Sequence, residues 1–407
     1  MSSSWQRKKF GDCAELIRNT CLPGEFEGMP YIGLEHIEEG TLRLLKLGTT
    51  TDVISAKSHF ESGDILFGKL RPYFRKVVRP RFSGVCSTDI WVVRAKQDID
   101  QGYLFYWMAS QEFVDAATQA SEGTKMPRAK WDFLERIEKP IPLLPEQHDI
   151  AHILGTLDDK IELNREMNQT LEAMAQALFK SWFVDFEPFR DQGMQDSPLG
   201  EIPVGWRVVC LSELGEIVCG KTPPTADSEN YGGNIPFVTI PDMHNKVFIT
   251  RTATYLSEKG AATQPKKLLP KHSVCVSCIA TPGLVAITPE PCHTNQQINS
   301  IICDSMASPY WCYLAVMSIR QEIVTGGAGG SATLNLNKGE FSKLQVLTPD
   351  NETMKKFHNL VEPIFSRVLS NELENITLDA TRDALLPKLL SGELRVKDAE
   401  RFMESKL

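Results

Sequence analysis

The 407-residue sequence lacks the long apolar runs that would place a chain in a membrane or direct it to secretion. No stretch of 18 apolar residues occurs, and Met1 to Phe10 contains no apolar segment of a signal peptide. The ten cysteines mostly lack close paired spacing, which argues against a disulfide framework. These absences predict a cytoplasmic protein with reduced thiols and no contact with a membrane.

Residue groupings typical of catalysis are missing as well. We find no Ser/His/Asp arrangement, no supported carboxylate pair, and no Asn-Pro-Pro-Tyr or glycine-rich cofactor motif of a methyltransferase. Cys275, Cys278, Cys292 and His293 have a spacing that resembles a zinc site. However, residues 273–279 are typical of a strand, where side chains three apart point to opposite faces. The sequence therefore predicts no catalytic residue and no metal site.

One motif leaves an enzymatic alternative open. Gly215–Thr222 matches the phosphate-binding P-loop pattern, so a nucleotide-binding enzyme acting through Lys221 and Thr222 is the main competing interpretation. A P-loop needs a helix that starts at its Lys-Thr pair, and Pro223 and Pro224 disfavour that helix. A turn is the simpler role for these residues.

An excess of positive charge is also absent, since the formal net charge is −8. The acidity is concentrated in residues 146–199, which hold 11 acidic and 4 basic side chains, whereas residues 1–145 hold 19 and 20. DNA phosphates would be repelled by the acidic segment, which suits a protein partner better. Nucleic-acid binding would therefore depend on local basic patches in the flanking segments.

What the sequence does contain is a long heptad pattern, which we call the first seam. Apolar residues recur at steps of four and three from Ile150 to Trp182, as expected of a helix roughly 50 Å long. The same pattern returns 207 residues later, from Phe357 to Leu389, as the second seam. Two unrelated buried helices are the alternative interpretation.

Both seams carry asparagine at the same two positions. These are Asn164 and Asn168 in the first seam, and Asn371 and Asn375 in the second. Polar residues in an apolar seam fix the register of a coiled coil. Antiparallel pairing would join Asn164 to Asn375 and Asn168 to Asn371. We therefore predict an antiparallel coiled coil with these four amides at its centre.

The segments before the two seams also repeat. Residues 31–37 match 237–243, and the aromatic run at 103–107 matches that at 310–314. Each segment combines short alternating strands, at 91–93 and 274–276, with short helices, at 103–111 and 310–321. The predicted fold class is thus α+β, with two repeated α+β domains separated by two long helices. A chain built this way is a pseudo-twofold object suited to a two-part DNA site.

Two kinds of segment are candidates for contact with DNA. Residues 65–88 and 259–289 contain no acidic side chain, and we predict that they are counterparts in the repeat. Their cations are candidates for phosphate or guanine contacts. Loops before each seam and the amides after residue 294 are further candidates, with plain connections and strand-end hydrogen bonding as alternatives. The full set is Lys69, Arg71, Arg75, Lys76, Arg79, Arg81, Lys125, Arg128, Lys130, Lys266, Lys267, Lys271, Asn295, Gln296, Gln297 and Lys338.

Several motifs together resemble one protein family. Leu144–Ile150, followed by the first seam, looks like the central region of a type I restriction-modification specificity subunit. Leu386–Val396 is similar to the distal region of that family, and Trp206–Leu211 with Tyr231–Phe237 resembles the start of its target-recognition domains. Pro363 and Pro387 depart from the pattern and are expected to interrupt the second helix.

The resemblance implies a non-catalytic subunit that reads one half of an asymmetric DNA site with each target-recognition domain. The helix pair would set the gap between the halves. Two modification (methyltransferase) subunits and restriction (endonuclease and translocase) subunits would be partners. The modification subunits would methylate adenine with S-adenosylmethionine, and the restriction subunits would cleave DNA with ATP and Mg. A protein-only scaffold is the second alternative. The implied divisions are target-recognition domain 1 at 1–144, the central spacer helix at 145–189, a hinge at 190–205, target-recognition domain 2 at 206–348, the distal spacer helix at 349–396 and a C-terminal tail at 397–407.

Overall fold

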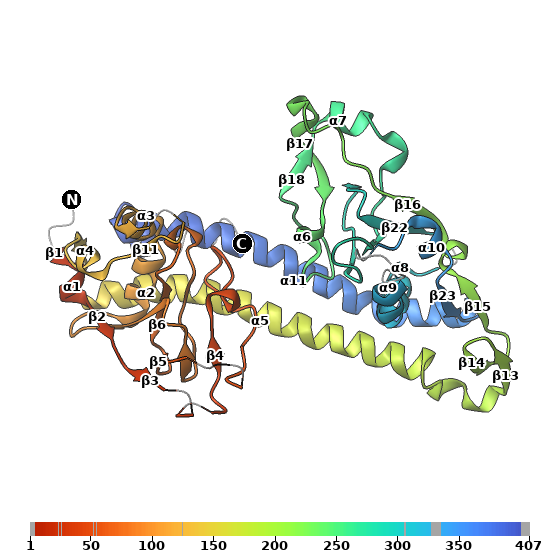
Figure 1. Ribbon diagram of the computed structural model, residues 1–407, viewed down its shortest axis with the longest axis horizontal. Helices are drawn as coiled ribbons and strands as arrows, with labels where there is room; N and C mark the ends of the chain where they lie inside the picture. The colour runs from red at the N-terminus through yellow and green to blue at the C-terminus, as the bar shows by residue number, and fades with distance from the viewer. Residues whose placement is uncertain are drawn as a thin grey trace. The chain divides into compact units, whose positions relative to one another are not determined.

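The computed structural model describes residues 5–22, 24–25, 27–51, 53, 55–123, 125–304, 307–326 and 335–399. The chain divides into two compact units (Figure 1). Unit 1 comprises Met1–Glu162 together with Ile376–Leu407, and unit 2 comprises Leu163–Asn375. Each unit therefore contains one α+β domain and a part of both long helices, α5 (Leu144–Phe183) and α11 (Asn351–Ser391).

The domain of unit 1 is built on two four-stranded sheets. The first has the order β2-β9-β6-β7, formed by Ala14–Ile17, Ile90–Ala95, Ile65–Gly68 and Val77–Val78. The second has the order β3-β5-β8-β4, formed by Thr20–Cys21, Lys57–Phe60, Gly84–Cys86 and Tyr31–Ile32. The other elements are β1 (Gln6–Lys9), α1 (Phe10–Cys13), α2 (Gln101–Ala109), α3 (Gln111–Gln119), β10 (Ser121–Glu122), β11 (Arg128–Ala129), α4 (Trp131–Leu134) and β12 (Glu138–Ile141).

The domain of unit 2 has the same kind of framework. A four-stranded sheet has the order β16-β22-β19-β20, formed by Gly215–Cys219, Ile298–Cys303, Val274–Ser277 and Val285–Ile287. A three-stranded sheet has the order β18-β17-β21, formed by Thr254–Leu256, Tyr231–Val238 and His293–Thr294. The other elements are β15 (Arg207–Cys210), α6 (Ile240–Met243), α7 (Glu258–Ala262), α8 (Pro309–Ser318), α9 (Arg320–Gly326), α10 (Lys338–Ser342) and β23 (Gln345–Thr348).

The strand pairings establish that the two domains are structural repeats. The parallel pair β4 and β8 joins Ile32 to Cys86, and the parallel pair β17 and β21 joins Val238 to Thr294. The four-stranded sheets β2-β9-β6-β7 and β16-β22-β19-β20 also match. In the first, β9 pairs antiparallel with β2 and β6, and in the second, β22 pairs antiparallel with β16 and β19. The repeat predicted from the aligned sequence segments, and the α+β class, are therefore confirmed.

In unit 1 the helices α5 and α11 complete the core of the domain. Ile150, Leu154 and Leu157 of the first seam are buried in one cluster with the aromatic side chains of α2. The same cluster includes five leucines that α11 supplies, which are Leu378, Leu385, Leu386, Leu389 and Leu390. The aromatic run of residues 103–107 is buried because α2 packs against β7 and β9 and also contacts α5, where Tyr106 donates to Asp158 at 2.6 Å. The domain and its helices thus share one hydrophobic core.

In unit 2 the two helices lie side by side and antiparallel (Figure 1). The side chain of Asn164 donates to Asn375 Oδ1 at 3.0 Å, and Asn371 donates to Asn168 Oδ1 at 2.8 Å. These are the two pairs that the antiparallel alignment of the seams predicts. Asn168 also donates to the backbone carbonyl of Val368 at 3.3 Å. Three of these asparagines are buried, and the pairing gives each of them a hydrogen-bond partner where water cannot reach.

Two local expectations are wrong. Pro363 and Pro387 do not interrupt α11, which runs without a break from Asn351 to Ser391. Each proline removes a single backbone donor, and the buried side chains on both sides keep the helix packed. The segment 190–205, expected as a hinge, contains a hairpin formed by Met194–Ser197 (β13) and Gly200–Pro203 (β14). Helix α5 itself ends at Phe183, ahead of the boundary placed at residue 189.

The described residues contain no helix with the length and apolar composition that a membrane span requires.

Candidate nucleic-acid interface

The structure brings together two of the basic segments that the sequence placed far apart. Residues 69–71 run beside residues 127–129, with Leu70 and Arg128 forming an isolated β-bridge. The amide of Arg71 donates to the carbonyl of Pro127 at 2.8 Å, and the amide of Ala129 donates to the carbonyl of Lys69 at 2.9 Å. Lys69, Arg71, Lys125, Arg128 and Lys130 therefore belong to one surface, which we call the basic loop surface.

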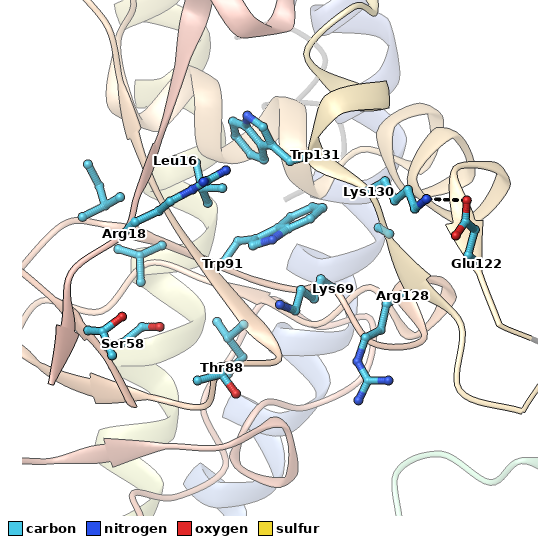
Figure 2. Close-up of a pocket in the computed structure, with 15 residues that line it drawn as sticks. Leu16, Arg18, Ser58, Lys69, Thr88, Trp91, Glu122, Arg128, Lys130 and Trp131 are labelled. Atoms are coloured by element: carbon cyan, nitrogen blue, oxygen red, sulfur yellow. Dashed lines mark hydrogen bonds and ion pairs between the residues drawn. The ribbon is translucent and has the colours of Figure 1, made fainter. Parts of the chain in front are cut away.

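A pocket of about 570 Å³ opens beside the basic loop surface. Figure 2 shows Trp91 and Trp131 in its middle, with cationic side chains arranged around them. The two indole rings meet edge to face, with centroids 5.4 Å apart. The cationic residues of the lining are Arg18, Lys69, Arg128 and Lys130. A pocket with aromatic walls and a basic rim suits a nucleic-acid ligand.

Arg128 is held in place by the carboxylate of Asp89. Its Nε lies 2.8 Å from Asp89 Oδ1, and its Nη2 lies 3.2 Å from Asp89 Oδ2. This pairing raises the pKa of Arg128 above its ordinary value, through hydrogen bonding and charge attraction. The Arg128 side chain is still 47% exposed. The ion pair fixes the direction of a guanidinium that remains accessible to a ligand.

Lys130, by contrast, forms an ion pair with Glu122 at the edge of the pocket (Figure 2). Both side chains are exposed, at 54% and 71%. A flexible, hydrated pair of this kind contributes little to stability and leaves the ammonium group available to a phosphate.

The rest of the basic stretch faces the helices and neighbouring loops of unit 1. Arg75 forms an ion pair with Asp383 of α11 at 3.4 Å, and Arg81 pairs with Asp159 of α5. Arg79 lies over the ring of Phe105, with 5.5 Å between the guanidinium carbon and the ring centroid. Lys76 donates to the carbonyl of Leu34 at 2.8 Å. These contacts favour a structural role for the four cations, in holding the domain on its helices.

In unit 2 the amides of Asn295, Gln296 and Gln297 form a tight turn between β21 and β22. Asn295 Nδ2 donates to Gln297 Oε1 at 3.0 Å, and Asn295 Oδ1 accepts from the backbone amide of Gln297 at 3.0 Å. Gln296 is exposed, and its Oε1 accepts a hydrogen bond from the hydroxyl of Thr222. Strand-end hydrogen bonding thus accounts for Asn295 and Gln297, whereas Gln296 is available to a base.

The turn at Asn295–Gln297 is the counterpart of the turn at Ser87–Asp89 in unit 1. Gln297 and Asp89 each donate their amide to the side chain two residues earlier, at 3.0 and 3.2 Å. Their carbonyls accept from the amides of Cys278 and Lys69, both at 2.9 Å. The residue after Cys278 and the residue after Lys69 each form an isolated β-bridge with a later segment of the same unit. These bridges join Ile279 to Asn335 and Leu70 to Arg128. The same surface arrangement is therefore built twice.

The candidate lysines of unit 2 do not lie at the positions that correspond to the basic loop surface of unit 1. Lys266 and Lys267 lie in a short 3-10 helix, Pro265–Lys267, and Lys271 precedes β19. The basic residues of unit 1 instead follow β6, which is the counterpart of β19. The two acid-free stretches therefore correspond at β6 and β19, but the lysines of the second stretch lie ahead of β19 and do not match the cations that follow β6. Lys338 is the exposed first residue of α10. Residues 327–331 of the glycine-rich loop, and Thr124, lie outside the described residues.

The P-loop alternative is excluded by the local backbone. Gly215–Cys219 form strand β16, and residues 220–224 have no helical structure, so no helix begins at Lys221. Gly220 is needed for a close approach to the following turn, since an added Cβ would lie 2.1 Å from the carbonyl oxygen of Asn295. Packing therefore explains this glycine without a phosphate.

The zinc alternative is not supported either. Cys275 and Cys278 lie on opposite faces at β19, and Cys275 accepts a hydrogen bond from Ser300. Burial raises the pKa of Cys275 to about 12 and that of Cys278 to about 11, so both thiols keep their protons at neutral pH. The described residues include no grouping of three metal ligands.

Some residues of the interface were not singled out in the sequence. Arg18, Trp91 and Trp131 enter the pocket from three separate segments, which only the folded chain brings together. Asp89 holds the side chain of Arg128, and Thr222, considered above only for the P-loop pattern, donates to the side chain of Gln296. No sequence signal points to Asp89, because a carboxylate is not expected on a DNA surface.

Comparison with known proteins reveals similarity over nearly the whole chain. The family model described as type I restriction modification DNA specificity domain matches twice, over residues 2–173 and 203–377. The type I restriction enzyme HindI specificity subunit of Haemophilus influenzae is 36% identical over 459 aligned positions, covering 96% of this chain and 100% of the relative. The MjaIX specificity subunit of Methanocaldococcus jannaschii is 29% identical, covering 74% and 71%. The crystal structure of the S subunit of a type I restriction-modification system from M. genitalium has a TM-score of 0.59 at 14% identity, covering 95% and 96%, and has the same fold.

Proposed function

Because the chain belongs to the family of type I restriction-modification DNA specificity subunits, we propose that it directs partner subunits to a two-part DNA sequence. Each domain reads one half of the sequence, and the two halves differ because the two domains carry different side chains. The observation that carries this proposal is the duplicated surface, in which the turns at 87–89 and 295–297 make the same hydrogen bonds.

The proposed division of labour leaves the chemistry to other chains. Modification subunits methylate adenine with S-adenosylmethionine, and restriction subunits cleave DNA with ATP and Mg. Two observations support a non-catalytic role for this chain. Most of the P-loop pattern forms strand β16, and the cysteines of the zinc-like pattern are buried free thiols. Assembly with these partners in the cytoplasm is part of the proposal, and free cysteines accord with that compartment.

Mapping of methylated sites tests the proposal directly. Genomic DNA is sequenced for modified bases from cells that express this chain with its modification subunit. We expect one methylated motif with two short specified parts and an unspecified gap of fixed length. Modified sites without such a motif would contradict the proposal. A scaffold that binds proteins only is distinguished by a binding titration, because phosphate contacts make the affinity for DNA fall steeply with salt.

A further inference from the structure

Arg128 lines the pocket of unit 1, and one edge of its guanidinium is held by Asp89. Asp89 contacts the side of the group, through Nε at 2.8 Å and Nη2 at 3.2 Å. A guanidinium has five N–H donors in a rigid plane, so this side-on contact uses one donor of Nε and one of Nη2. Among the described residues, no hydrogen bond or ion pair engages Nη1. The end-on edge, formed by Nη1 and the second donor of Nη2, remains for a ligand.

The end-on edge matches one base in the major groove. Guanine presents two acceptors there, O6 and N7, and a bidentate arginine is its commonest specific partner. Adenine presents a donor beside N7, so it cannot accept from both nitrogens of the same edge. Asp89 restrains the guanidinium before DNA arrives, which lowers the entropy lost on binding. The carboxylate would also repel a phosphate, so the site favours a base edge over the DNA backbone.

The counterpart site in unit 2 has a different chemistry. The position of Arg128 is taken by Asn335, and that of Asp89 by Gln297. Among the described residues, the turn of unit 2 therefore holds no guanidinium clamped by a carboxylate. Since the two surfaces share one backbone arrangement, this difference is a source of different sequence preferences in the two halves.

We propose that Arg128, held by Asp89, is the residue that reads a G·C pair in the half of the DNA site bound by the first domain. This assignment rests on the proposed function, and adds to it the identity of one recognised base pair and the residue responsible.

The test uses the full chain together with its modification subunit, with methylated sites mapped for wild type, Arg128→Ala and Lys130→Ala. Loss of a bidentate contact reduces discrimination against the wrong base by about 5- to 150-fold. We expect one G·C position in the first half of the motif to become unspecified in Arg128→Ala, with the second half and the gap unchanged. Lys130→Ala removes an equal charge from the same surface, and should lower the extent of methylation without changing the motif.

Two further variants separate recognition from general binding. Arg128→Lys keeps the charge but loses the planar fork, and should relax the same position as Arg128→Ala. Asp89→Asn should relax it partially, because the guanidinium is no longer oriented. If Arg128→Ala abolishes methylation, the purified complex is titrated with duplexes that carry single substitutions at each G·C pair of the first half. Relative affinities equal to those of the wild type would overturn the assignment.

The outcomes also separate this inference from the proposed function. A two-part motif that Arg128→Ala leaves unchanged, or changes only at an A·T pair or in the second half, refutes the role of Arg128 alone. A wild-type map that contains no two-part motif refutes the proposed function itself.

Discussion

Arg382 is a fully buried guanidinium in unit 1, surrounded by three aspartates. Its Nη1 lies 2.7 Å from Asp158 and 3.2 Å from Asp379, and its Nη2 lies 3.1 Å from Asp383. Burial lowers the pKa of Arg382, but the summed attraction of these carboxylates raises it above its ordinary value. Asp379 also pairs with Arg43 of the first domain. The cluster therefore joins α5 and α11 to the domain of unit 1.

Replacement of Arg382 by methionine should destabilise unit 1 strongly. The side chain has a similar length, but Asp158 and Asp379 lose a buried partner, and breaking a buried pair in this way costs about 3–5 kcal/mol. Thermal or denaturant unfolding of the variant measures the loss. Lys356→Met on the exposed face of α11, where Lys356 pairs with Glu352, should cost less than about 1 kcal/mol. Equal losses in the two variants would contradict a central role for Arg382.

Glu372 of unit 2 should make stability depend on pH. Burial raises its pKa from 4.5 to about 7; nearby Glu172 also raises it, and Lys246 lowers it. Between these two values the folded state holds a proton that the unfolded state releases. The free energy of unfolding therefore falls as pH rises from about 4.5 to 7, by at most about 3 kcal/mol.

Glu372→Gln should remove this dependence, because the amide cannot ionise. Unfolding of the full chain is followed by denaturant titration at a series of pH values, with Glu352→Gln on the exposed face of α11 as the control. A stability that falls equally over this range in wild type and Glu372→Gln would show that Glu372 does not cause the effect.

At the scale of elements, the paired helices show how polar groups set a register. The side chain of Asn371 donates to Asn168, but its own Oδ1 is buried and has no partner among the described residues. An incompletely satisfied amide pair costs stability in an apolar seam, and its benefit is the rejection of shifted alignments. The pair thus contributes to specificity of alignment more than to the strength of the helix pair.

The corresponding prediction concerns single and double variants. Asn371→Leu leaves Asn168 without its amide partner, and should lower the free energy of unfolding by about 1–3 kcal/mol. Asn168→Leu combined with Asn371→Leu removes both polar groups, and should be close to neutral or stabilising. A double variant that loses more stability than the two single variants combined would refute this account.

The elements also show which features were predictable from sequence. The heptad steps, the matched asparagines and the strand at 274–276 follow from local periodicity, so the helices, their register and the α+β repeat could be predicted. The orientation of Arg75, Arg79 and Arg81 could not, because it depends on carboxylates and rings that lie far away in the sequence. For the same reason an acid-free stretch did not distinguish a DNA surface from a docking surface.

At the scale of the whole molecule, the two units differ in how the chain forms them. Unit 2 is one continuous segment, whereas unit 1 needs residues from both sides of unit 2. The later segment supplies the five leucines of α11 and Arg382 to the core and the charge cluster of unit 1. Unit 1 is therefore the part of the molecule that depends on a distant stretch of sequence.

Truncation after Asn375 should expose the core of unit 1 and leave that of unit 2 intact. Limited proteolysis followed by mass spectrometry should find cuts within residues 1–162 well before cuts within residues 163–375. Truncation after Ala399 keeps all five leucines, and should restore the wild-type order of cleavage. Equal resistance of the two units in the shorter chain would contradict the division described here.

The discontinuous construction of unit 1 has a consequence for biosynthesis. A ribosome releases residues 14–141, which contain every strand of the two four-stranded sheets, long before residues 376–399. Unit 2 therefore has all of its sequence first, and unit 1 reaches its final core only when translation has passed the second seam. A nascent chain, or one that terminates before residue 376, therefore has a first domain with an incomplete core. Such a domain is open to cleavage by proteases.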